Sequence, residues 1–330
     1  TPLYSSAASD VYKRQDVYRK AQCAVKLFIV GGKSPTGKAL IESLRRNKIR
    51  FVSPPEKFFD LDNTLGIAKV ISDYAPSQLI NLTDFISGNH SALKKSESAE
   101  VRCRQINAQL PAVLSEISNH LNIRILQLSN PYVFDGEKKL SYNENDELNP
   151  KGVYGRCTLA GEESVRAHSK HIIIRSGWLF GQHKRGLIKS WIRSLKRYHG
   201  ELPVNRRRFS PTSTKNLAAA ILAVIRQVSC DAEVWGTYHY AGLETKREIE
   251  FARQTFDYAV SHDEDLYDIM NNIKIVEHQI SEPEILNATL SSKKIFDTFG
   301  IKPKSWHADL KETILSLYVK RAGPKLHDRI

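Results

Sequence analysis

The sequence predicts an α/β protein with a doubly wound parallel sheet. Short runs rich in Val, Ile and Leu alternate with segments of helical periodicity over about 150 residues. A glycine-rich turn separates the first apolar run from the first helical segment. Strands that alternate with helices are joined by crossovers, which make the sheet parallel and place ligands at the carboxyl ends of its strands.

The expected elements follow one another along the chain. Short, β-branched apolar runs are typical of buried strands, and apolar residues three and four positions apart are typical of helices. Strands are expected at residues 25–30, 49–52, 78–82, 123–128 and 172–175, and helices at residues 38–44, 65–74 and 98–121.

The turn after the first strand has the spacing of a phosphate-binding loop. Gly31 and Gly37 hold the outer positions of a G-x-x-G-x-x-G pattern, and Ser34 holds the middle one. Glycines let backbone amides approach a pyrophosphate, and a helix N-terminus adds partial positive charge. Glycine turns between a strand and a helix can also be purely structural. We expect Gly31, Ser34, Pro35, Thr36 and Gly37 to bind a dinucleotide.

Three further residues are candidates for cofactor contacts. Asp60 and Leu61 follow the second strand and could meet an adenine, and Asn81 lies near the end of the third strand. The acid that often binds the ribose hydroxyls of NAD directly after the second strand is absent, and Ser53 stands there. The choice between NAD and NADP therefore stays open.

Composition narrows the classes of partner. The net charge is +13, but the basic residues are spread along the chain and no basic helix is interleaved with aromatic residues. Anionic small molecules such as sugar diphosphates therefore fit better than nucleic acid. No apolar run approaches the roughly 20 residues of a membrane span. The four cysteines are widely spaced without metal-ligand pairing, so we expect a cytoplasmic protein without a metal site.

Both ends of the chain are expected to lie outside the fold. Residues 1–15 have neither an apolar signal core nor helical periodicity, and they resemble adapter-derived tails of environmental sequence assemblies. The chain begins without Met, so we expect its natural start to be missing. Residues 1–23 are expected to form a disordered or artefactual tail, and residues 320–330 a basic C-terminal tail.

Several spaced motifs carry a family resemblance. They are SNPYVFDG at 129–136, YxExDxxxPxxxYG at 142–155, LAGE at 159–162, RSGWLFG at 175–181, SPT at 210–212 and GTYHYAG at 236–242. With them the chain resembles the extended short-chain dehydrogenase/reductases. Within that group it resembles the dTDP-4-dehydrorhamnose reductases and their relatives, which include the regulatory β subunit of methionine adenosyltransferase.

The resemblance implies both a domain plan and a reaction. The plan is an NAD(P)-binding Rossmann domain, expected at residues 24–175, and a smaller C-terminal domain that is mainly substrate-binding, expected at residues 176–319. The reaction is hydride transfer from NADPH or NADH to a keto carbon of a nucleotide sugar. In the family a Tyr protonates the developing alkoxide, and a Ser or Thr hydrogen-bonds the same oxygen. A Lys one helical turn beyond the Tyr holds the nicotinamide ribose and lowers the Tyr pKa.

The catalytic positions depart from this set. Tyr154 matches the Tyr and Asn107 matches a supporting Asn, but Asn130 stands at the Ser/Thr position and Thr158 at the Lys position. An amide can still donate a hydrogen bond to a carbonyl, whereas Thr158 brings no cation to a Tyr whose free pKa is about 10. One positioned acid/base group contributes about 10²–10⁴-fold in rate, so we expect reductase activity to be impaired.

The substrate loop also differs from the family. Relatives usually read V-N-D-Q-x-G-x-P-T, whereas this chain has Arg206, Arg207, Arg208 and Phe209 after Val204-Asn205. Arg suits phosphate bidentately, so the three arginines could grip a diphosphate, with Arg207 most central. They could equally form a solvated loop, and as exposed charges they should contribute little to stability. Trp178 is a candidate for substrate contact or for packing.

Three functional readings are open. We favour a nucleotide-sugar-binding protein of this family whose reductase chemistry is impaired or lost. A second reading is an active reductase in which another cation replaces the missing Lys. A third is a non-catalytic subunit that joins another enzyme, and a homodimer is also possible. The sequence favours a packing role for His239, which lies within an apolar strand.

Overall fold

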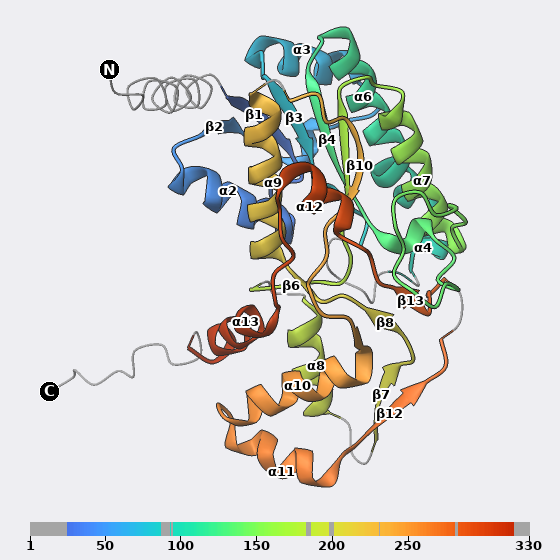
Figure 1. Ribbon diagram of the computed structural model, residues 1–330, viewed down its shortest axis with the longest axis vertical. Helices are drawn as coiled ribbons and strands as arrows, with labels where there is room; N and C mark the ends of the chain where they lie inside the picture. The colour runs from blue at the N-terminus through green and yellow to red at the C-terminus, as the bar shows by residue number, and fades with distance from the viewer. Residues whose placement is uncertain are drawn as a thin grey trace, which may run out of the picture.

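The computed structural model describes residues 25–86, 93, 95–182, 186–197, 201–230, 232–280 and 283–319. The expected tails at 1–23 and 320–330 lie outside these residues. None of the helices in these residues has both the length and the apolar character of a membrane span. Figure 1 shows a sheet flanked by helices at one end of the molecule and a smaller group of helices and short strands at the other.

The main sheet is parallel and has the order β10-β5-β4-β3-β1-β2. Its strands are β1 (Lys26–Val30), β2 (Arg50–Val52), β3 (Gln78–Asn81), β4 (Arg124–Ser129), β5 (His171–Arg175) and β10 (Gly236–His239). The chain leaves β1 on one side to form β2 and continues on the other side with β3. The predicted doubly wound sheet is confirmed, and its switch point lies between β1 and β3.

The side chains of β1 alternate between the two faces of the sheet, and helices cover both faces. Leu27 and Ile29 pack on the face covered by α2 (Pro35–Arg46) and α9 (Thr214–Ser229), whereas Phe28 packs on the opposite face. That opposite face carries α3 (Thr64–Tyr74), α6 (Leu110–His120) and α7 (Gly152–Arg166) (Figure 1). Burial on both faces explains why the strands read as continuous apolar runs.

The expected single helix over residues 98–121 is wrong. The structure has α4 (Lys95–Ser98), α5 (Glu100–Arg104), a π-helical turn η3 (Gln105–Gln109) and then α6. Pro111 has no N–H to donate to the carbonyl of Asn107, four residues earlier, and the N–H of Leu110 donates to Gln105 instead. A Cβ at Gly161 of α7 would lie 2.1 Å from the Asn107 carbonyl oxygen, so α7 packs directly on this turn. The irregular turn fixes Asn107 at the site described below.

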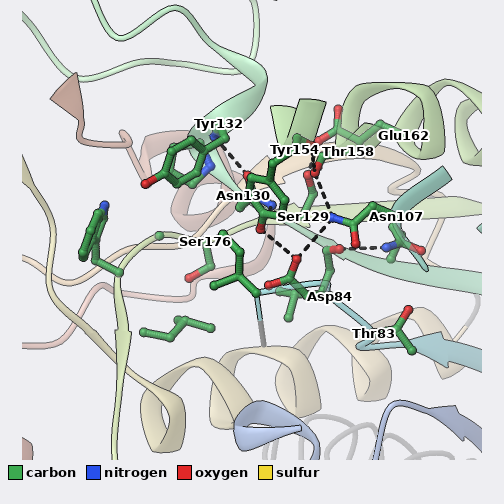
Figure 2. Close-up of a pocket in the computed structure, with 17 residues that line it drawn as sticks. Thr83, Asp84, Asn107, Ser129, Asn130, Tyr132, Tyr154, Thr158, Glu162 and Ser176 are labelled. Carbon is green, nitrogen blue, oxygen red and sulfur yellow. Dashed lines mark hydrogen bonds between the residues drawn. The ribbon is translucent and has the colours of Figure 1, made fainter. Parts of the chain in front are cut away.

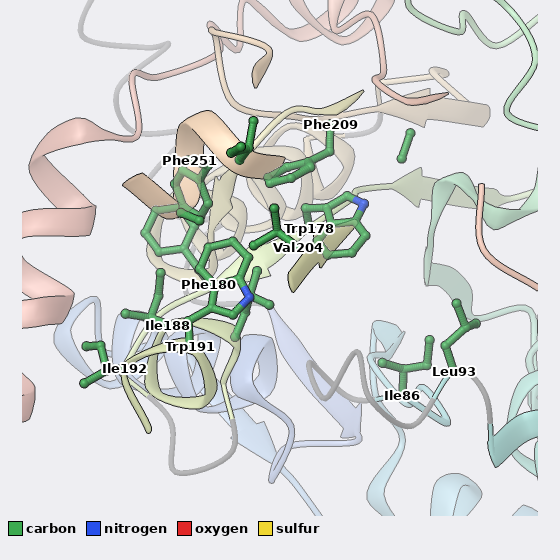
Figure 3. Packing of buried hydrophobic residues seen from close by; sticks show 14 of the residues in the cluster. Ile86, Leu93, Trp178, Phe180, Ile188, Trp191, Ile192, Val204, Phe209 and Phe251 are labelled. Atoms are coloured by element: carbon green, nitrogen blue, oxygen red, sulfur yellow. The ribbon is translucent and has the colours of Figure 1, made fainter. Parts of the chain in front are cut away.

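The smaller part of the chain has an aromatic core. Phe251 packs against Trp191 and Phe209, with ring centroids 5.9 and 5.6 Å away (Figure 3). It also packs against Trp306, at 5.1 Å between centroids. The helices here are α8 (Leu187–Leu195), α10 (Glu248–Val260), α11 (Glu264–Asn272) and α13 (His307–Val319). The short strands are β6 (Leu179–Phe180), β7 (Glu201–Asn205), β8 (Arg208–Phe209), β9 (Thr212–Ser213), β11 (Lys246–Arg247), β12 (Lys274–His278) and β13 (Asn287–Ala288).

The chain crosses between the two parts more than once. α9, β10 and α12 (Lys293–Phe299) follow residue 175 in the sequence but lie in the layers of the main sheet. There β10 pairs with β5, and Phe299 of α12 packs on Tyr238 of β10. The division at residue 175 remains a prediction. His239 ends β10 and is fully buried, with its ring beside Arg175 and the Tyr142 carbonyl. Burial and then the Arg175 charge lower its pKa to about 3, as expected for a neutral core histidine.

Candidate active site

The glycine turn lies at the switch point of the sheet. Gly31 has φ +79°, and a Cβ there would lie 2.7 Å from the backbone of Leu82, just after β3. A Cβ at Gly37 would lie 2.3 Å from the Gly31 carbonyl oxygen. Only residues without side chains allow the loop to fold this closely, so both glycines are required by the backbone.

Helix α2 begins at Pro35 rather than at residue 38, so the expected start is three residues late. Ser34 caps the helix by accepting a hydrogen bond from the Gly37 N–H at 3.0 Å, and Pro35 occupies the first turn. Thr36 and Gly37 are therefore buried residues of the first turn, and Pro35 borders a different groove. The helix N-terminus points its free amides toward the carboxyl edge of the sheet.

One cavity joins this turn to the candidate adenosine residues. Its lining includes Gly31, Ser34, Asp60 and Leu61, which the sequence singled out, and Glu56, which it did not. Glu56 lies in a short 3₁₀ turn that follows β2, so a carboxylate stands near this end of the sheet after all. The lining also includes Phe59, Asp62, Thr83, Asp84, Phe85, Arg102, Gln105, Ile106 and Leu110.

Asn81 does not line this cavity but holds the loop that does. Its side chain is fully buried and donates to Gln127 Oε1 at 2.8 Å. Its Oδ1 accepts from the backbone N–H and the hydroxyl of Thr83, at 3.1 and 2.8 Å. Asn81 therefore fixes the loop after β3, which carries Thr83 and Asp84 into the cavity.

A second pocket brings together the four residues predicted at the catalytic positions. Tyr154, Asn130, Thr158 and Asn107 all line it, although they come from α7, the end of β4 and η3 (Figure 2). Asn130 Nδ2 donates to Tyr154 OH at 2.7 Å, and Asn107 Nδ2 donates to Thr158 Oγ1 at 3.0 Å. The rest of the lining is Thr83, Asp84, Ile86, Gln127, Leu128, Ser129, Pro131, Tyr132, Glu162, Ser176, Gly177, Trp178 and Leu179.

Local backbone structure positions the Asn130 amide beside the Tyr154 hydroxyl. Asn130 precedes the 3₁₀ turn η4 (Pro131–Val133) and accepts from the Tyr132 N–H at 3.0 Å, which leaves its amide nitrogen directed at Tyr154. A Cβ at Gly155 would lie 2.3 Å from the Tyr132 carbonyl oxygen, so α7 rests against that turn. Tyr154 is buried in consequence.

Thr158 takes part in the network without adding charge. Its hydroxyl donates to the Tyr154 carbonyl oxygen at 2.9 Å and accepts from Asn107. The Thr158 side chain is buried, and its one proton is used within α7. The position at which the family has an ammonium group is therefore neutral.

Asp84 lies at the centre of the site, and the sequence did not single it out. The Tyr154 hydroxyl donates to Asp84 Oδ1 at 2.7 Å, and Asn107 Nδ2 approaches the same oxygen at 3.2 Å (Figure 2). Burial, followed by the Asp84 charge and this hydrogen bond, raises the pKa of Tyr154 well above its usual value. The signal in the sequence was the position of Asp84, three residues after β3 and so at the carboxyl edge of the sheet.

The described part of the pocket wall supplies no positive charge to Tyr154. Of the described residues that line the pocket, none is Lys, Arg or His. Glu162, the other lining carboxylate, is buried and holds Arg175 through bonds of 2.8 and 2.7 Å. It also pairs with Arg166 and accepts from Ser129, so its charge ties α7 to β4 and β5.

The expectation that all three loop arginines are exposed is wrong for Arg207. Exposure alternates from residue 206 to 209, so Arg206 and Arg208 point outward while Arg207 and Phe209 point inward. The buried Arg207 pairs with Glu248 and Glu284, and its guanidinium lies 3.9 Å from the centre of the Trp178 ring.

Arg206 and Arg208 line a surface groove together with Lys138, Lys139 and Arg247. Arg207 also borders this groove, while its partner Trp178 lines the Tyr154 pocket and packs on Phe209. The Arg207–Trp178 stack therefore forms a wall between the basic groove and the pocket.

The fold and the two joined cavities define a Rossmann-type protein of the short-chain dehydrogenase/reductase kind. Residues 25–319 match the family described as the RmlD substrate binding domain, and the chain belongs to that family. The dTDP-4-dehydrorhamnose reductases of Sinorhizobium fredii and Aggregatibacter actinomycetemcomitans are each 27% identical to it. The matches cover 88% and 87% of this chain and 97% of each relative.

Solved structures agree with this assignment. A dTDP-4-dehydrorhamnose reductase from Clostridium acetobutylicum is 28% identical, with a TM-score of 0.75 over 89% of this chain and 99% of that one. The reductase of Bacillus anthracis, solved in complex with NADP, has the same fold, with 22% identity, a TM-score of 0.73 and coverage of 88% and 99%.

Proposed function

We propose that this protein binds a nicotinamide dinucleotide and a nucleotide sugar, and that its reductase chemistry is impaired. One observation carries the proposal: the Tyr154 hydroxyl donates a hydrogen bond to the Asp84 carboxylate, while Thr158 stands where the family has a Lys. The cofactor is NADP or NAD, and the Bacillus anthracis relative with NADP supports this class of ligand.

The cofactor role is supported by the cavity at the switch point. Gly31 and the N-terminus of α2 offer backbone amides to a pyrophosphate, and Asp60 and Leu61 line the far end of the same cavity. Thr83 and Asp84 line both this cavity and the Tyr154 pocket. A dinucleotide held at the glycine turn can therefore extend its nicotinamide toward Tyr154.

The nucleotide-sugar role is supported by the basic groove. Arg206, Arg208 and Lys139 face it and would attract a diphosphate. Arg207 is buried between this groove and the Tyr154 pocket. Trp178, which stacks on Arg207, would contact the sugar on the side of the pocket. The relatives named as dTDP-4-dehydrorhamnose reductases support this class of ligand.

The proposed impairment of hydride transfer rests on the negative charge of Asp84 beside the Tyr154 hydroxyl. In a reductase of this kind the keto carbon of the substrate receives hydride from the reduced cofactor, and the Tyr gives its proton to the alkoxide oxygen that develops. Loss of that proton would place a tyrosinate 2.7 Å from the Asp84 carboxylate, so Tyr154 is a weak acid here. Asn130 can still orient a carbonyl oxygen, but it offers no ionisable proton.

The other two readings have different support. An active reductase would need a substitute cation, and the described residues that line the pocket include none. A non-catalytic subunit fits the retained cavities as well as a free binding protein does. A partner enzyme or a homodimer thus stays part of the proposal, and a copurification experiment would distinguish them.

Dinucleotide binding is the first requirement. We expect saturable binding of NADPH or NADH, and we expect Asp60→Ala to weaken it by about tenfold, because a charge-assisted hydrogen bond at the adenosine end is lost. Titration of nicotinamide fluorescence measures both. Asp268→Ala, on the exposed face of α11, is the matched control and should bind like wild type. Absence of saturable binding at millimolar cofactor would remove the cofactor role.

A further inference from the structure

We infer that Asp84 makes this site select the oxidised, positively charged nicotinamide over the reduced form. The inference rests on the proposed binding of a dinucleotide and adds the redox state that the site prefers. It starts from the position of Asp84, which the resemblance to the reductases did not indicate.

Asp84 stands where the two cavities meet. Thr83 and Asp84 are the residues that the linings of the glycine-turn cavity and the Tyr154 pocket share among those described. Thr158, at the position where the family contacts the nicotinamide ribose, is connected to Asp84 through Asn107 by bonds of 3.0 and 3.2 Å. A nicotinamide that reaches Tyr154 must therefore lie beside the Asp84 carboxylate.

The carboxylate is held in place by its neighbours. Tyr154 OH and Asn107 Nδ2 both donate to Oδ1, and Asn107 is itself fixed because its Oδ1 accepts from the Phe85 N–H at 2.8 Å. Figure 2 shows Asp84 directed at these groups from the loop after β3. The charge is thus preorganised rather than free to turn away into solvent.

The two redox forms differ in charge at the ring beside this group. The oxidised nicotinamide carries one positive charge and the reduced ring carries none, whereas the adenosine and the pyrophosphate are the same in both. The field of Asp84 therefore acts on the difference between the forms, and buried pocket walls strengthen that field. A Lys at position 158 would oppose it, but this chain has Thr158.

The preference gives the site a distinct role. A dinucleotide held in the oxidised form has no hydride to donate, so occupancy would follow the oxidised-to-reduced ratio of the cofactor pool. Ligand binding at the neighbouring nucleotide-sugar site could then respond to the redox state of the cofactor pool, without any turnover of the cofactor.

Calorimetric titration of the full chain with NAD⁺, NADH, NADP⁺ and NADPH tests this inference. We expect wild type to bind the oxidised form about tenfold more tightly than the reduced form of the same cofactor. Asp84→Asn keeps the shape and removes the charge, so the ratio of the two dissociation constants should fall to about one. Asp60→Asn at the adenosine end is the matched control, because it should weaken both forms equally and leave the ratio unchanged.

The outcomes separate this inference from the proposed function. If wild type binds the reduced form as tightly as the oxidised one, or if Asp84→Asn leaves the ratio at its wild-type value, the inference is overturned and dinucleotide binding stands. If neither form binds, the proposed function fails and the inference fails with it. The wild-type ratio needs no variant, and Asp84→Ser provides a second neutral replacement if Asp84→Asn does not fold.

Discussion

Replacing Arg207 with Ala is expected to lower the free energy of unfolding by about 3–5 kcal/mol, because it strands two buried carboxylates. Glu248 and Glu284 both pair with this guanidinium, and burial raises the pKa of Glu248 while Arg207 lowers it. The variant also loses the stack on Trp178. Urea denaturation followed by circular dichroism measures the change.

Arg208→Ala is the matched control for this experiment. It removes the same side chain one position along the chain, but Arg208 points into the open groove and pairs with no described carboxylate. We expect a change within about 0.5 kcal/mol of zero. Equal stability of the Arg207 and Arg208 variants would show that the buried pairing described here is wrong.

The second large effect concerns catalysis. Thr158→Lys combined with Asp84→Ala is expected to raise the reductase rate by about 10²–10⁴-fold over wild type, because the double change restores a cation and removes the carboxylate at Tyr154. Thr158→Lys alone should gain less, since its ammonium would be partly neutralised by Asp84. Oxidation of NADPH or NADH with dTDP-4-dehydrorhamnose as substrate measures the rates.

A third change controls the catalytic experiment. Tyr154→Phe in the doubly changed background removes the acid and should return the rate to the wild-type level. A double variant that is no faster than wild type would mean that the Lys position and Asp84 do not limit the chemistry, and that the altered substrate loop does.

Much of the fold could be predicted because its signals are local. Each strand of the first half is a short apolar run beside a helical segment, so the strand positions were correct to within one residue at each end. The gathering of Tyr154, Asn130, Thr158 and Asn107 was predictable for a different reason. All four belong to motifs whose spacing the family resemblance supplied.

The failures come from interactions between distant parts of the chain. The break in the helix over 98–121 depends on how Pro111 and Gly161 meet the Asn107 carbonyl. Asp84 lies in a loop without periodicity, and only its pairing with Tyr154, 70 residues later, reveals its role. The alternation with Phe209 indicated that Arg207 is buried, but the run of three arginines suggested that all three are exposed.

We propose that the Tyr154 site lacks the charge balance of a reductase. Turnover of dTDP-4-dehydrorhamnose by wild type, with NADPH and with NADH at saturating concentration, tests it most directly. We predict a rate at least about 10²-fold below the ordinary enzyme range of roughly 1–10³ per second. A rate within that range would contradict the claim, because Tyr154 would then act as an efficient acid beside the Asp84 carboxylate.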